Sequence, residues 1–221
     1  ALSADPVSAA FPIAVGDNDA VWTATKQTKF LDSYGSTQAG LTAALADIGS
    51  VTATELKITN ALTVSATTVI PPNILVKFEG NGLASISSGQ TLTIGRMADV
   101  GNRQVFTGTG SVRFSSGAVE AMNVFWWTGG TTAGTNRITA SINQIIASAT
   151  ANGGGVMYIP QGTWTTTGNH AVCNNLIIKG DGLTTTVLKA SQNGDGVFTH
   201  GANIYDVLVQ NLTIDGDGYT I

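Results

Sequence analysis

The chain has 221 residues, of which 43% are hydrophobic and 11% charged, and its formal net charge is −4. An average soluble domain carries about 25% charged residues, so Thr, Ser, Asn, Gln and Gly must keep this surface soluble. No basic stripe is available to neutralise phosphates, which excludes nucleic acid as an expected partner. We expect no membrane span either, because no apolar run reaches the ~18 residues that crossing a bilayer requires. The composition favours strands of β-branched residues between tight turns.

The first segment, residues 1–35, is irregular. Pro6, Pro12 and the run from Gly16 to Asp19 interrupt any period. Proline removes a backbone donor, and turn residues of this kind separate regular elements. We interpret the segment as an extended N-terminal arm or linker that docks on a partner such as a virion or surface protein.

Two helices are predicted, each directly ahead of a series of strands. The apolar side chains of residues 38–48 and of residues 137–151 recur at the spacing of one helix face. Gly49 and the run from Asn152 to Gly155 follow them as stop signals. An uncapped coil of stacked strands leaves apolar side chains and strand edges exposed. We therefore interpret both segments as capping helices.

Short runs of β-prone residues follow the first helix, with Gly, Asn, Pro and Ser between them. The runs are residues 56–58, 62–64, 68–70, 74–78, 84–86, 92–94, 104–106 and 111–114. Only Asn81-Gly82 offers the dipeptide of a tight hairpin turn. Stacked coils therefore fit this segment better than hairpins.

A repeat marks the second half of the chain. Residues 174–182 (NNLIIKGDG) return 36 positions further on as residues 210–218 (QNLTIDGDG). One long coil of three strands or two shorter coils would satisfy this offset, and each coil would bury its inward Ile, Leu or Val by stacking on the next. We expect Ile178 to point inward, and Thr166→Asp to be nearly neutral.

These segments resemble a known family. The helix that leads into residues 153–164 (GGGVMYIPQGTW) looks like the opening of pectate-lyase-superfamily β-helices, which include phage tailspikes and tail fibres. Residues 176–189 are similar to the first full coils of that family. Residues 62–94 resemble the small β-solenoid that often precedes such a domain.

The resemblance implies an all-β fold, a right-handed parallel β-helix with short amphipathic capping helices. Residues 128–221 would begin the main β-helix, and residues 36–127 would form the smaller β-solenoid behind the N-terminal arm. The family usually carries an acidic stretch ahead of its second helix, where residues 128–136 read TGGTTAGTN. We therefore expect no metal or substrate feature at that place.

Aromatic residues gather where the two predicted solenoids meet. Trp126, Trp127 and Trp164 are the candidate ligand-binding residues, with Tyr158, because an exposed ring could stack on a sugar. The alternative is burial at cap and domain junctions, where large rings pack well. In that case the cluster Phe125-Trp126-Trp127 would wedge the two solenoids together.

Carboxylates are the candidate catalytic groups, since glycan hydrolysis in this family generally uses a pair of them. The candidates are Asp206, Asp215 and Asp217. Asp181 occupies the turn equivalent to that of Asp217 one repeat earlier, so turn chemistry is the favoured explanation for Asp217. The sequence leaves open whether the protein is an enzyme.

We expect no metal and no cofactor. His170 and His200 lack the close spacing of a zinc site, and Cys173 is the only cysteine, which excludes an internal disulfide. Asp17-Asn18-Asp19 resembles a fragment of a calcium loop but lacks the rest of that motif.

The resemblance implies an extracellular protein, on a virion tail or secreted or at a cell surface, that attaches to a host or environmental glycan. Two alternatives stay open: a polysaccharide depolymerase, lyase or glycoside hydrolase, with its active site downstream or between subunits, and a structural filament or adhesin subunit. We expect a homotrimer, because weakly charged faces rich in Thr and Val repel one another little. We also expect the native chain to continue beyond Ile221, since a repeat strand ends there without a polar cap.

Overall fold

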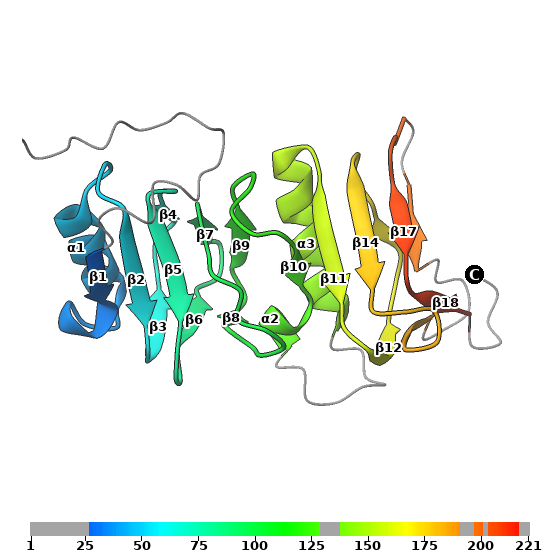
Figure 1. Ribbon diagram of the computed structural model, residues 1–221, viewed down its shortest axis with the longest axis horizontal. Coiled ribbons are helices and arrows are strands. Elements are labelled where there is room, and N and C mark those ends of the chain that lie inside the picture. Colours follow the sequence, from blue (N-terminus) through cyan, green and yellow to red (C-terminus); the bar gives the residue numbers. More distant parts are fainter. Residues whose placement is uncertain (1–26, 129–137, 191–196, 201–202, 217–221) are drawn as a thin grey trace, which may run out of the picture.

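The computed structural model describes residues 27–128, 138–190, 197–200 and 203–216. Most regular structure in these ranges is strand, and every ladder between the described strands is parallel. The strands are stacked in chain order along the long axis of the molecule (Figure 1). This all-β arrangement of parallel strands fits a β-helix.

The first stack contains two helical segments and nine strands. They are β1 (Gln27–Phe30), η2 (Leu31–Ser33), α1 (Gln38–Ile48), β2 (Thr54–Ile58), β3 (Ala61–Val64), β4 (Thr68–Ile70), β5 (Ile74–Phe78), β6 (Leu83–Ile86), β7 (Thr91–Ile94), β8 (Phe106–Gly108) and β9 (Ser111–Phe114). Its sheets have the strand orders β1-β2-β5, β3-β6-β8 and β4-β7-β9. Two passes of the chain, β2-β3-β4 and β5-β6-β7, thus supply one strand to each sheet.

The second stack follows the same plan. Its elements are β10 (Met122–Asn123), α2 (Phe125–Thr128), α3 (Ile138–Asn152), β11 (Gly155–Ile159), β12 (Gly162–Thr166), β13 (His170–Ala171), β14 (Leu176–Gly180), β15 (Thr186–Ala190), β16 (Phe198–Thr199), β17 (Leu208–Gln210) and β18 (Thr213–Asp215). The strand orders are β10-β11-β14-β17, β12-β15-β18 and β13-β16. The division of the chain into domains at residue 128 stays a prediction.

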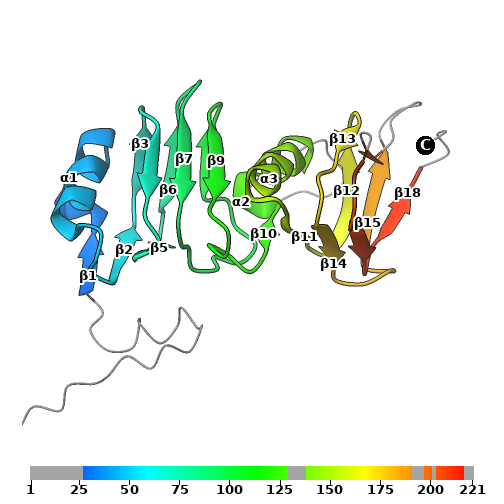
Figure 2. The same cartoon turned by 90° about the horizontal axis from the view of Figure 1, so that it is seen from above.

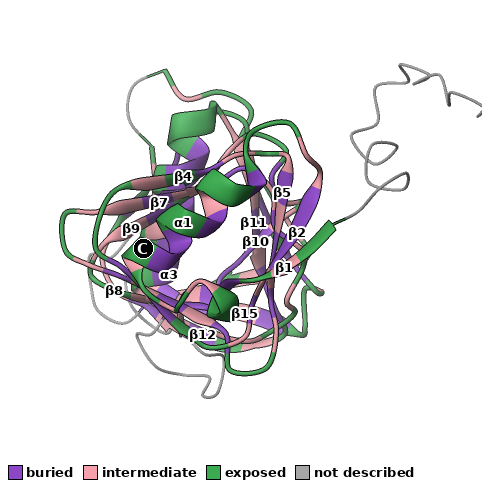
Figure 3. Ribbon diagram, turned by 90° about the vertical axis from the view of Figure 1, so that its left-hand side faces the viewer, coloured by how far each residue is buried: buried purple, intermediate pink, exposed green. Residues whose placement is uncertain are grey.

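The core lies inside the stacked coils. Along β5 the side chains of Ile74, Val76 and Phe78 are buried, while those between them are partly exposed. Successive side chains of a strand point to opposite faces of its sheet, so each strand sends every second residue inward. Figure 3 shows the buried parts of the strands facing the centre of the cross-section.

α1 covers the first end of the stack (Figure 3). The hydroxyl of Thr37 accepts a hydrogen bond of 3.2 Å from Gly40 N–H, an N-cap that contributes about 1 kcal/mol. Leu41 and Ala44 lie on the inner face of α1 and are fully buried. Gly49, at φ +70°, ends the helix. The bounds of α1 are those that the apolar spacing predicts.

The predicted N-terminal arm requires a correction. Residues 1–26 of that arm lie outside the described residues. The next residues, however, are part of the stack, because β1 pairs in parallel with β2. η2 contacts both α1 and β2, which leaves Leu31 fully buried. An apolar contact that is distant in sequence thus orders a segment that has no period of its own.

α3 lies between the two stacks (Figure 2). Its side chains replace a neighbouring strand for β9: Gln144 Oε1 accepts from Val112 N–H at 3.2 Å, and Ser148 Oγ from Phe114 N–H at 2.8 Å. Asn152 Nδ2 donates to Phe114 O. An unpaired strand edge favours aggregation, and the helix closes this one.

The aromatic residues ahead of α3 join the stacks, as predicted. Trp126 packs against Phe114 of the first stack, with ring centroids 5.6 Å apart. Phe125 packs edge-on against Trp164 of the second stack at 4.8 Å. Such pairs contribute about 0.5–1.5 kcal/mol beyond the area they bury.

Two expectations about the second stack are wrong. Thr166 is 1% exposed and contacts Thr139 and His170, because Trp164 faces inward and Thr166 lies on the same face of β12. The sequence repeat also differs from the stacking repeat, since Ile178 pairs with Val209, 31 positions later, and not with Ile214. The reason is that β17, which precedes Ile214 in the chain, pairs with β14.

None of the helices in the described ranges is both long and apolar enough to span a bilayer. The run expected at residues 104–106 forms a strand slightly later, as β8.

Candidate functional site

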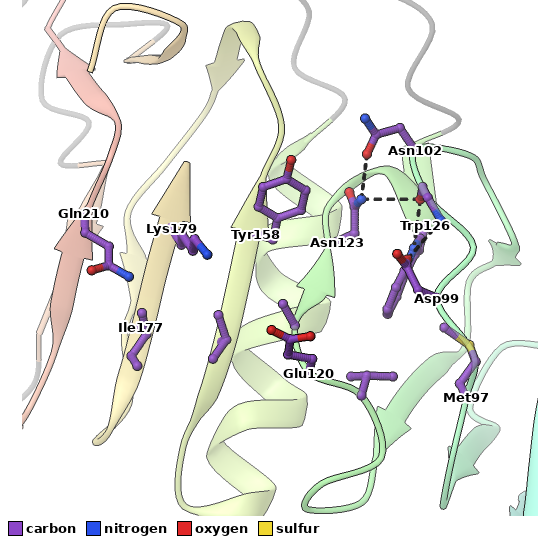
Figure 4. A pocket seen from close by; sticks show the side chains of 14 residues that line it. Met97, Asp99, Asn102, Glu120, Asn123, Trp126, Tyr158, Ile177, Lys179 and Gln210 are labelled. Atoms are coloured by element: carbon purple, nitrogen blue, oxygen red, sulfur yellow. Dashed lines mark hydrogen bonds between the residues drawn. The ribbon is translucent and has the colours of Figure 1, made fainter. Parts of the chain in front are cut away.

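A groove lies on the outer surface where the two stacks meet (Figure 4). It has a volume of about 710 Å³, within the range of pockets that hold small ligands. A second hollow of about 350 Å³ adjoins it. The residues common to both linings are Val119, Glu120, Ala121 and Val156. The two hollows are therefore neighbours on one surface.

The floor of the groove is the sheet β10-β11-β14-β17. Asn123, Tyr158, Lys179 and Gln210 are register partners on these four strands and form a continuous polar row. Figure 4 shows this row crossing the strands. Adjacent strands lie about 4.8 Å apart, so the polar groups recur at regular steps.

An apolar row lies beside the polar one. Val156 and Ile177 are register partners on β11 and β14, and both line the groove. Met157 and Ile178, between the two rows in sequence, point into the core and are fully buried. The period of two along each strand thus separates core residues from groove residues.

One wall is the loop of residues 97–102, which long-range hydrogen bonds hold in place. Met97 N–H donates to Ala118 O at 3.0 Å. Gly101 O accepts from Asn123 Nδ2 at 3.3 Å and from Trp126 Nε1 at 3.2 Å. These bonds fasten the loop to the floor and place Asp99 at the groove.

Two carboxylates line the groove. Asp99 is exposed and accepts a hydrogen bond from Gly101 N–H within its own loop, at 2.9 Å. Glu120 is also exposed, and within the described ranges no hydrogen bond or ion pair of its side chain occurs. Both carboxylates are thus open to a ligand.

Tyr158 is the partly exposed aromatic residue on the floor. Its hydroxyl donates a hydrogen bond of 2.7 Å to Asp181 Oδ1. Burial raises the pKa of Tyr158 to about 12, with contributions from this hydrogen bond and from the negative charges of Asp181 and Asp99. The hydroxyl therefore stays protonated at neutral pH, while its oxygen can still accept a hydrogen bond.

Trp126 and Trp164 are buried, as the alternative interpretation of the sequence predicts, and so they do not offer exposed platforms for a sugar. Trp126 is 1% and Trp164 3% exposed, and their indole N–H groups donate to Gly101 O and Pro160 O. Trp126 lies beneath the groove, but its ring is covered. Trp127 packs among Phe106, Phe114 and Trp126. The physical reason is the junction, which needs large apolar side chains.

Of the predicted catalytic acids, Asp206 and Asp215 do not line the groove. Asp215 Oδ2 lies 3.4 Å from Lys189 Nζ, its register partner on β15. Asp206 is exposed in the connection before β17, with φ +57°. Asp217 lies outside the described residues. Asp181 accepts from Gln161 N–H as well as from Tyr158, so it orders the turn.

Within the residues that the structure describes, no three His, Cys, Asp or Glu side chains lie close enough together to hold an ion. His170 is 2% exposed and contacts Asn143 and Thr166, and Cys173 is buried as a free thiol.

Residues 122–220 match a family model described as rhamnogalacturonase A/epimerase, pectate lyase-like. The matched segment begins at β10 and so contains the whole floor of the groove. No curated protein and no solved structure matches the chain.

The match and the parallel strands together support a polysaccharide-related β-helix of the pectate lyase superfamily. This support applies to the second stack, which the matched residues cover.

The groove as a whole was not predicted from the sequence, although Tyr158 was a candidate for stacking on a sugar. Lys179 could have been found too, because it alternates with buried residues on a predicted strand and must therefore face outward. Asp99 and Glu120 lie in irregular segments and gave no comparable signal.

Proposed function

We propose that this protein is an extracellular right-handed β-helix, on a virion tail or a cell surface, that attaches to polysaccharide through the groove. The observation that carries the proposal is the row of accessible polar side chains of Tyr158, Lys179 and Gln210 beside the apolar row of Val156 and Ile177. A sugar offers hydroxyl groups at its edge and C–H groups on its face. The polar row can bond to the hydroxyl groups, and the apolar row can pack against the C–H groups.

The shape of the site supports a polymeric ligand. The groove is open, and polar groups of successive strands repeat along its floor. A chain with a regular repeat can make the same contact several times, which strengthens binding without improving any single contact. A small compact ligand would gain nothing from this repetition.

Binding measurements on groove variants test the proposal. Tyr158→Ala and Lys179→Ala should each weaken binding to the recognised polysaccharide about tenfold, the effect of losing an important contact. Thr163→Ala is the matched control, because Thr163 is exposed on β12 and lies outside the groove. Unchanged binding by both groove variants, with the fold intact, would contradict the proposal.

A depolymerase is the second candidate function, because two carboxylates line the same groove. In a glycoside hydrolase one carboxylic acid protonates the leaving oxygen while the other activates water or attacks. Asp99 and Glu120 are the pair available for these roles. Release of new reducing ends by the wild-type chain, abolished in Asp99→Asn and in Glu120→Gln, would favour this function over attachment alone.

We further propose that three chains assemble side by side as a homotrimer. The support is the low charge of the chain, which limits repulsion between neighbouring faces. A trimer would present the groove three times. Light scattering should give three chain masses at micromolar concentration. A single chain mass would refute the trimer, and a ladder of masses would favour a filament.

A further inference from the structure

The groove carries more negative than positive charge. Asp99 and Glu120 line it as carboxylates, and Lys179 supplies the one ammonium group among its described lining residues. Asp181 adds a third carboxylate at the rim, bonded to the Tyr158 hydroxyl. The charge of Asp99 contributes to the raised pKa of Tyr158, so the negative potential of this carboxylate extends to the floor of the groove.

We propose that the groove selects glycans without acidic groups and rejects polyuronates, an inference that rests on the proposed function. Sugar hydroxyls can donate to the open carboxylates of Asp99 and Glu120, and hydrogen bonds to charged acceptors are the stronger kind. A uronate brings another carboxylate to the same place. Lys179 can pair with one such group, but the two groove carboxylates then face the rest of the charged chain.

The size of the effect depends on salt. Like charges placed together across a binding site disfavour the wrong partner strongly. The open groove is solvated, and the Debye length is about 10 Å at 0.1 M ionic strength. Discrimination against a polyuronate should therefore be largest at low salt and should fall as salt is added.

Two forms of one polymer test this preference. Polygalacturonate and its fully methyl-esterified form share a backbone, and the ester replaces each charged carboxylate by a neutral group, so binding of the full chain to both shows which form the groove prefers. The wild type should prefer the ester, and Asp99→Asn/Glu120→Gln should bind polygalacturonate about tenfold more tightly than the wild type at low salt. Glu79→Gln, which removes a carboxylate outside the groove, should leave both affinities unchanged.

Three results would overturn the inference: a wild-type preference for polygalacturonate, no gain for polygalacturonate in the double variant, or an equal gain in Glu79→Gln. The proposed function fails differently. If Tyr158→Ala leaves binding to every tested polysaccharide unchanged, the groove does not bind glycans at all. If Tyr158→Ala abolishes binding while polygalacturonate remains the preferred ligand, the attachment function stands and the charge selection is wrong.

Discussion

The hydroxyl of Ser148, in the middle of α3, accepts a hydrogen bond of 2.8 Å from the backbone N–H of Phe114 on β9. Both residues are buried, at 0% and 2% exposure. The partner that a further strand would supply to β9 therefore comes from a helix. This contact links the end of one stack to the element that opens the next.

Removing that hydroxyl should be costly. Ser148→Ala leaves the buried N–H of Phe114 without its acceptor, and we expect a loss of about 1–3 kcal/mol in the free energy of unfolding. Ser141→Ala is the matched control on the same helix, because the Ser141 hydroxyl is buried without a partner among the described residues. This second variant should be neutral or stabilising. Denaturant unfolding measures both, and an equal loss in both would refute the capping role.

The direction of side chains in the second stack can be tested by burying a charge. Ile178 is fully buried on β14, so Ile178→Asp should cost several kcal/mol. Thr166→Asp should also destabilise, because Thr166 contacts Thr139 and His170 inside the stack. Thr163→Asp, at an exposed position of β12, should change stability by less than about 0.5 kcal/mol. A thermal melt that ranks Thr163→Asp with Ile178→Asp would show that the register is wrong.

Asp181 and Asp215, two aspartates in the repeated sequence, should contribute differently to stability. Asp181 accepts hydrogen bonds from Tyr158 Oη and Gln161 N–H, both at 2.7 Å, so Asp181→Ala should cost about 1–2 kcal/mol. Asp215 forms an ion pair with Lys189 and its side chain is 43% exposed. Asp215→Ala should therefore cost about 0–1 kcal/mol, as is usual for surface ion pairs. Equal losses in urea unfolding would contradict the turn-ordering role of Asp181.

Stability at alkaline pH should depend on the ionisation of Tyr158. Its pKa is about 12 in the folded protein and about 10 in an unfolded chain. The folded state therefore holds this proton more tightly, and the stabilising contribution is complete below about pH 10 and is lost as the pH rises towards 12. In a spectroscopic titration, Tyr158→Phe should remove the tyrosinate step at the higher pH. Loss of a step near pH 10 instead would contradict the burial of this hydroxyl.

Local sequence patterns predicted the elements whose contacts are local. α1 follows from the spacing of Leu41, Ala44 and Ile48, which lie on one helix face wherever the helix packs. The same kind of reasoning would have placed Thr166 correctly, because it shares a face of β12 with Trp164. The repeat was misleading, since Ile178 and Ile214 have similar neighbours in sequence but lie in different sheets.

The groove depends on contacts that no local pattern encodes. The loop of residues 97–102 takes its place because Asn123 and Trp126 bond to Gly101 O, more than twenty positions away. Asp99 becomes part of a site only through these bonds. Part of the polar row could be predicted, since Tyr158 and Lys179 lie on predicted strands. That they are neighbours, however, follows only from the register of β11 and β14.

The position of α3 ends the strand ladder of β9. On one side β9 pairs with β7, and on the other side Gln144, Ser148 and Asn152 of α3 reach individual backbone groups of β9. A further strand would have to continue the register of β9, whereas helix side chains contact single backbone groups and impose no register. α3 is thus an adaptor: the strands that follow it take their register from β10 and from one another, and not from β9.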